Sequence, residues 1–218
     1  MNDSAAVKPR QSELAGSPRD IAGGDVQRTL LVLAAWFFLA LWLSVTGKLV
    51  TPGGLPIGLG AAIVLPLIVF AVDKRVGHPL FGGLMRLDLS ALIAAQTFRV
   101  IGVIFLIAWS AGTLPGGFAL PAGIGDVAVG LTAPFVATAV ARRRPLGVAW
   151  LWAILGTADL IIAVTLGVLH GGPPLGLLAG PITTNVVARY PMSLIPTFGV
   201  PLALLLHVRT FGALARSD

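Results

Sequence analysis

The chain contains no cysteine and few charged residues. Asp, Glu, Lys and Arg make up 11% of its 218 residues, whereas apolar residues make up 56%. The lack of cysteine excludes disulfides, thiolate nucleophiles and cysteine-ligated metals. The scarcity of charge, with a mean hydropathy of +0.92, excludes an ordinary soluble domain and indicates a protein whose main solvent is the bilayer.

Long apolar stretches are what the chain has instead. Each crossing of a bilayer takes about 20 apolar residues, and six stretches approach or exceed this length: 29–46, 55–72, 89–111, 121–141, 147–168 and 191–208. We therefore expect an all-α fold, a polytopic transmembrane bundle of six helices over 29–208. Residues 1–28 are polar without apolar periodicity, which predicts a disordered cytoplasmic tail, and 209–218 form a second, short cytoplasmic tail.

The basic residues alternate between the two ends of these stretches. Twelve Lys and Arg lie on one side of the predicted bundle, and only Lys48 and Arg189 lie on the other. Because cytoplasmic loops carry the positive excess, both termini are expected in the cytoplasm. We expect an integral protein of a bacterial inner (plasma) membrane. The net charge of +6 is interpreted as a topology signal and not as a nucleic-acid surface, since the basic residues flank apolar segments.

Three ionisable residues interrupt the apolar stretches: Arg99, Asp126 and Asp159. Intramembrane charges are costly and usually face the bundle interior, pair with one another or mark a pathway. At a rise of about 1.5 Å per residue, they lie at overlapping depths of about 18, 8 and 14 Å from the same side. Gln96 shares the helix face of Arg99. We therefore predict a buried cluster in which Arg99 pairs with Asp159 or Asp126.

Proline interrupts the sixth predicted helix at Pro196 and Pro201. An interior proline removes a backbone hydrogen bond and kinks the helix. Broken membrane helices often line cavities, as in transporters, so both prolines are expected in a cavity wall. A plain structural kink is the alternative.

Catalysis has little support in the sequence. The chain has no H-E-x-x-H, G-x-S-x-G or Walker motif, which removes common metalloprotease, hydrolase and NTPase signatures. His170 is expected outside, and His78 and His207 at or near the cytoplasmic surface, so no haem, other cofactor or metal site is predicted. Asp126 and Asp159 could form an aspartyl pair, but a nearby arginine favours an ion-paired scaffold over an enzyme.

Two functional hypotheses remain. The first is a small permease or channel-like protein, in which Arg99 binds a small anionic substrate or balances a proton-exchanging aspartate. The second is a non-catalytic membrane scaffold or accessory subunit, in which the same residues form a structural seam. The lipid bilayer is the one partner that the sequence identifies. A solvent-reachable cavity at Arg99 would favour the permease, and dry packing would favour the scaffold.

Overall fold

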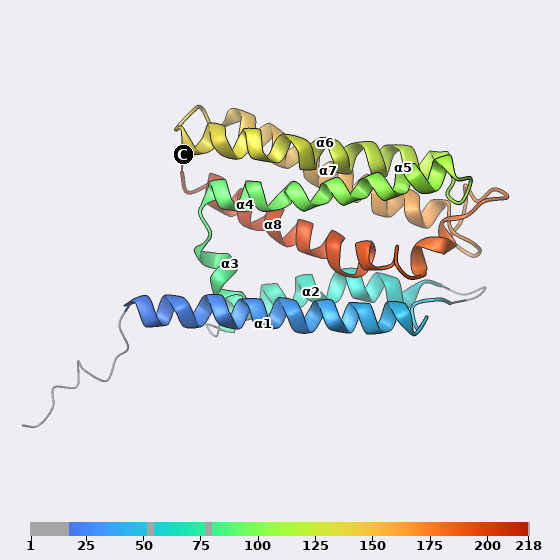
Figure 1. The fold of residues 1–218 in the computed structure, drawn as a ribbon, viewed down its shortest axis with the longest axis horizontal. Helices are drawn as coiled ribbons and strands as arrows, with labels where there is room; N and C mark the ends of the chain where they lie inside the picture. Colours follow the sequence, from blue (N-terminus) through green and yellow to red (C-terminus); the bar gives the residue numbers. More distant parts are fainter. Residues whose placement is uncertain (1–17, 52–54, 77–79, 218) are drawn as a thin grey trace, which may run out of the picture.

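The computed structural model describes residues 18–51, 55–76 and 80–217, and these residues form helices and no strand. Six helical segments are long and apolar enough to cross a membrane. The predicted all-α transmembrane bundle is therefore confirmed. The six spans run along one common axis, with the first two on one long side and the fourth and fifth on the other (Figure 1).

The third and sixth spans are each assembled from more than one helical segment. Among the described residues, α1 (Pro18–Val45) and α2 (Ile57–Val76) form the first two spans, and the short α3 (Gly82–Arg86) follows them. The third span consists of α4 (Leu89–Ala95), the 3-10 segment η2 (Gln96–Gly102) and α5 (Val103–Ser110). The fourth and fifth spans are α6 (Gly116–Ala141) and α7 (Gly147–Leu169), and after the 3-10 turn η3 (Thr184–Ala188) the π-helical segment η4 (Ile195–Gly199) and α8 (Val200–Leu214) form the sixth.

Large apolar side chains cover the outside of the bundle. Phe135 on α6 is 74% exposed, and Phe38 on α1 and Leu155 on α7 are also well exposed. A monomer in water rarely exposes continuous apolar surface on this scale. A surface of this kind fits contact with lipid chains, which are as apolar as the side chains themselves.

Small residues allow α6 to pack closely against the third span. Ala119, Ala122 and Ala133 on α6 are completely buried. A Cβ atom on Gly130 would lie 2.6 Å from the backbone nitrogen of Val100, so only glycine permits this approach. Without a hydrophobic driving force between helices in lipid, such close packing is a main source of helix association.

The first helix starts earlier than the sequence predicts. α1 begins at Pro18, so residues 18–28 are helical and not part of a disordered tail. The carboxylate of Asp25 accepts hydrogen bonds from Arg86 Nε at 2.9 Å and Nη2 at 2.6 Å, and Thr29 Oγ1 accepts one from the Gly83 nitrogen at 2.8 Å. These contacts with α3 stabilise the polar start of α1. The rest of the predicted tail, 1–17, lies outside the described residues.

Candidate functional site

Arg99 lies in the middle of the third span, where the helix tightens into the 3-10 segment η2. A stretch of 3-10 helix inside a longer helix often marks a functional or strained position. The Arg99 side chain is only 1% exposed, although it carries a full charge. Its position depends on the close approach of α6, which Gly130 on α6 and Gly102 on η2 permit.

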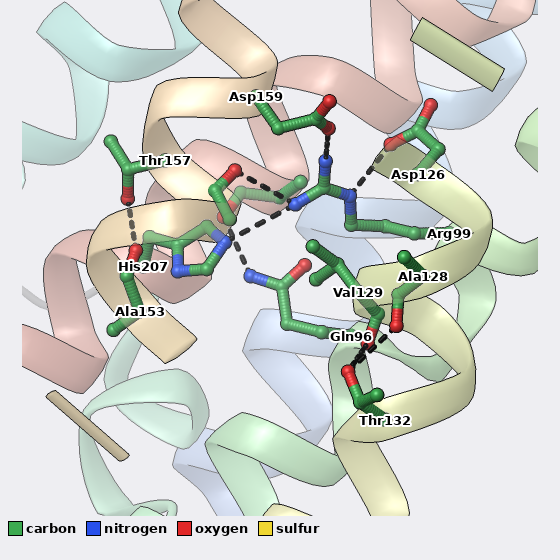
Figure 2. Close-up of polar contacts among 12 residues, drawn as sticks. Gln96, Arg99, Asp126, Ala128, Val129, Thr132, Ala153, Thr157, Asp159 and His207 are labelled. Atoms are coloured by element: carbon green, nitrogen blue, oxygen red, sulfur yellow. Dashed lines mark hydrogen bonds and ion pairs between the residues drawn. The ribbon is translucent and has the colours of Figure 1, made fainter. Parts of the chain in front are cut away.

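The guanidinium of Arg99 pairs with both predicted aspartates. Nε donates to Asp126 Oδ1 on α6 at 2.7 Å, and Nη2 donates to Asp159 Oδ2 on α7. Figure 2 shows the three side chains converging from three different spans. The structure therefore brings Arg99, Asp126 and Asp159 together, and Arg99 contacts both carboxylates at once.

The remaining terminal nitrogen of Arg99 has two further partners. Nη1 donates to the Gly156 carbonyl oxygen on α7 at 3.0 Å and lies 3.3 Å from His207 Nε2 on α8 (Figure 2). Arginine can only donate, so His207 Nε2 is the acceptor and Nδ1 carries the ring proton. Arg99, Asp126, Asp159 and His207, with the Gly156 carbonyl, are called the Arg99 cluster below.

The Arg99 cluster joins four spans through one cation. Arg99 contributes one positive charge against two carboxylates, and it donates to an acceptor on each of α6, α7 and α8. Charges taken out of water are tolerated only when they are paired and hydrogen-bonded. No group of three or more metal-ligating side chains occurs in the part of the chain that the structure describes. The arrangement is suited to holding helices together electrostatically.

Gln96 lies one turn before Arg99 and is completely buried. Its Nε2 donates to the Ala203 carbonyl oxygen on α8 at 3.0 Å, and its Oε1 has no hydrogen-bond partner among the described residues. Gln96 therefore adds a second polar link between the third and sixth spans. It is a neighbour of the Arg99 cluster and does not bond to its charged groups in the described structure.

His207 was predicted at or near the cytoplasmic surface, but the structure places it inside the bundle: it is 1% exposed and lies 3.3 Å from Arg99 Nη1 in the middle of the third span. The sixth span continues to Leu214, six residues beyond its predicted end, because the charge of Arg209 is accommodated. Arg209 Nη2 donates to the Met85 carbonyl oxygen at 2.8 Å. A usable sequence signal was the three- and four-residue spacing of the buried face of α8, which is formed by Val200, Ala203, His207, Thr210 and Leu214.

A cavity of about 410 Å³ lies on one side of the Arg99 cluster. Its walls come from residues 49–51, the start of α2, Phe105 on α5, the first half of α6, the second half of α7 and the segment from 171 to 200. Asp126 and Arg189 are the charged residues among its lining residues, and Arg99 is not among them. We call it the Arg189 cavity. It therefore reaches the edge of the Arg99 cluster at Asp126 and leaves the guanidinium enclosed.

One of the two predicted helix breaks is not a break. The sixth span begins at Ile195 and not at 191, so Pro196 lies in its first turn, where proline is tolerated, and there it lines the Arg189 cavity. Pro201, at the start of α8, is buried and is not among the lining residues. It has no N–H to bond the Thr197 carbonyl oxygen, and Trp36 Nε1 on α1 donates to that oxygen at 3.1 Å. Pro201 therefore creates an acceptor that links α1 to the sixth span.

The family comparison covers most of this architecture. The family model described as "Domain of unknown function (DUF8737)" matches residues 56–215, which include five of the six spans and the whole Arg99 cluster. The chain belongs to this family. No curated protein and no solved structure matches the chain.

Proposed function

We propose that this membrane protein is a small permease-like protein that binds an apolar or amphiphilic molecule in the Arg189 cavity. The observation that carries the proposal is the position of Asp126. This residue belongs to the enclosed Arg99 cluster and also lines an otherwise largely apolar cavity. A volume of about 410 Å³ falls in the range of about 300–1,000 Å³ that is typical of small-molecule sites.

In this proposal Arg99 is a positioning residue and does not touch the ligand. Its donors are directed at protein acceptors, and its side chain is 1% exposed. The π-helical start of the sixth span supports a permease, since η4 contributes Ile195 and Pro196 to the cavity wall and π-helical turns are frequent at functional sites. A non-catalytic scaffold is the second candidate, and the dry packing around Arg99 favours it.

Cysteine labelling separates the two candidates, because this chain has no cysteine. Ala163 lines the cavity, and the matched Ala133 is completely enclosed. In vesicles, we expect a membrane-impermeant maleimide to label Ala163→Cys and not Ala133→Cys. A permease predicts labelling of Ala163→Cys from either side of the membrane as the protein changes conformation. A scaffold predicts labelling from one side only.

Occupancy of the cavity is tested by filling it. Gly60 lines the cavity, and a Cβ on it would meet nothing within 4 Å; Gly58 lies on the same helix and is not among the lining residues. Native mass spectrometry of the purified protein detects a small molecule that is already bound, or hexadecan-1-ol that is added as an apolar probe. Gly60→Phe should lose the bound molecule, and Gly58→Phe should retain it. Equal retention by both variants would contradict the proposal.

We further propose that both termini face the cytoplasm, so that the cavity lies in the opposite half of the membrane. The basic residues support this orientation, since twelve Lys and Arg lie toward one side and two toward the other. Reporter enzymes fused after Asp218 should show that the C-terminus is cytoplasmic: a reporter that works only in the cytoplasm should be active, and one that works only outside should be inactive. Activity outside would reverse the orientation and place the Arg189 cavity in the cytoplasmic half.

A further inference from the structure

We propose that the ligand of the Arg189 cavity is a single-chain anionic amphiphile, a long-chain fatty acid anion, whose carboxylate binds Arg189. This inference rests on the proposed function, because it names the ligand class of the same cavity. Its basis is the distribution of charge and of apolar surface around the cavity.

The end of the bundle at which the cavity lies is purely cationic. The segments that connect the spans there, 46–56, 111–116 and 170–194, contain Lys48 and Arg189 and no Asp or Glu. Lys48 Nζ lies 4.2 Å from the centre of the Trp42 ring and is not among the lining residues. Arg189 is both exposed and part of the lining. An anionic group is therefore the charge that this end attracts.

Two polar side chains of the cavity lining close to Arg189 in the chain are engaged within the protein. Thr184 Oγ1 donates to the Gly167 carbonyl oxygen, and Asn185 Oδ1 accepts from the Gly172 nitrogen at 3.1 Å. Arg189 forms no ion pair within the described part of the chain. Its planar guanidinium can bind a carboxylate through two parallel hydrogen bonds. Arg189 is thus the cationic group of the lining that can bind an anionic ligand head.

The interior of the cavity fits an apolar chain. Phe105, Phe118 and Leu160 are among its walls, and of the Asp126 side chain only 10% is exposed, with one oxygen held by Arg99. The volume of about 410 Å³ lies near the lower end of ligand cavities, which favours one chain over the two chains of a phospholipid. A chain with its head at Arg189 would extend toward Asp126.

The test measures binding of radiolabelled hexadecanoate and hexadecan-1-ol to the full chain in phosphatidylcholine nanodiscs. Arg189→Gln should weaken hexadecanoate binding by about fivefold or more and leave hexadecan-1-ol unchanged. Lys48→Gln removes the same charge at the same end outside the cavity lining, and it should change neither affinity by more than about twofold. Gly60→Phe should abolish binding of both molecules.

Four outcomes would decide against this inference. If Gly60→Phe blocks both molecules while Arg189→Gln changes neither, the cavity binds a chain without reading its charge, so the ligand class is wrong and the proposed function stands. If Lys48→Gln weakens binding as much as Arg189→Gln, general surface charge accounts for the preference. If phosphatidylglycerol or hexadecylamine, tested in the same assay, binds more tightly than hexadecanoate, that molecule and not a fatty acid anion represents the ligand class. If Gly60→Phe changes nothing, the cavity itself is not the site and the proposed function fails as well.

Discussion

The Arg99 cluster and the Arg189 cavity share Asp126, yet they are built in opposite ways. In the cluster, charged atoms are enclosed and hydrogen-bonded, and a Cβ on the neighbouring Gly130 would lie 2.6 Å from a backbone nitrogen. In the cavity, the walls are largely apolar and a Cβ on Gly60 would meet nothing within 4 Å. Charge is thus placed where packing is tight, and open space is left where there is little charge.

This difference has a physical reason. A charge in a low-dielectric bundle needs partners in fixed geometry, and close packing supplies them. An empty polar space in a membrane would leave unsatisfied groups or admit water, whereas an apolar space can exchange its contents with lipid. The cluster can therefore hold the spans together while the cavity beside it stays unfilled by side chains.

The largest expected effect is on the charged side of the comparison. Arg99→Ala removes the cation and leaves the buried Asp126 and the partly buried Asp159 without it, so the free energy of unfolding should fall by about 3–5 kcal/mol. Reversible unfolding in detergent micelles measures this loss. Removing all three charges, with Arg99→Leu, Asp126→Asn and Asp159→Asn, should restore much of the stability. An Arg99→Ala variant as stable as the parent would show that the ion pairs do not stabilise the bundle.

The second effect tests the close packing around the cluster. In Gly130→Ala, the added methyl group would meet the Val100 nitrogen and the Arg99 carbonyl carbon, both backbone atoms that cannot move without displacing η2. Overpacking of this kind costs about 1–3 kcal/mol, measured by unfolding under the same conditions. An unchanged stability would mean that α6 and the third span are less closely packed than the structure has them.

A smaller effect is expected at His207. His207→Leu removes the imidazole acceptor of Arg99 Nη1, which keeps the Gly156 carbonyl oxygen. Loss of one hydrogen bond to a charged group should lower the free energy of unfolding by about 1.5 kcal/mol. His207→Gln, which retains an acceptor oxygen, should lose less. Nitrogen NMR of the imidazole should place the proton on Nδ1, and a proton found on Nε2 would contradict the assigned hydrogen bond.

The sequence predicts the part of this comparison that depends on charge and hydropathy. Six apolar stretches set the spans, and the similar depths of Arg99, Asp126 and Asp159 pointed to a cluster. Contact of Arg99 with both aspartates at once could not be derived, since it requires α6 and α7 to lie on the same side of η2. That adjacency follows from helix packing, for which local sequence gives only small-residue faces.

The cavity and His207 were beyond the sequence for different reasons. The cavity is a gap in the packing between α2, α7 and the segment that follows α7. Sequence patterns indicate which residues face a neighbouring helix, and they do not indicate where two neighbouring helices fail to touch. His207 was misplaced because the predicted sixth span stops at 208, just before Arg209, whereas the Arg209 side chain reaches the Met85 carbonyl oxygen. The depth predicted for His207 was therefore wrong because the Arg209 side chain finds an acceptor inside the structure.

The smallest expected effect lies on the open side of the comparison. Gly60→Ala adds the same methyl group as Gly130→Ala, also within a membrane-spanning helix, but into open space. Because alanine also loses less chain entropy than glycine on forming a helix, stability should be unchanged or raised by up to about 1 kcal/mol. Unfolding of Gly60→Ala beside Gly130→Ala gives this difference directly. If the two variants were destabilised equally, the space at Gly60 would be closed in the folded protein, and the contrast between a closed cluster and an open cavity would fail.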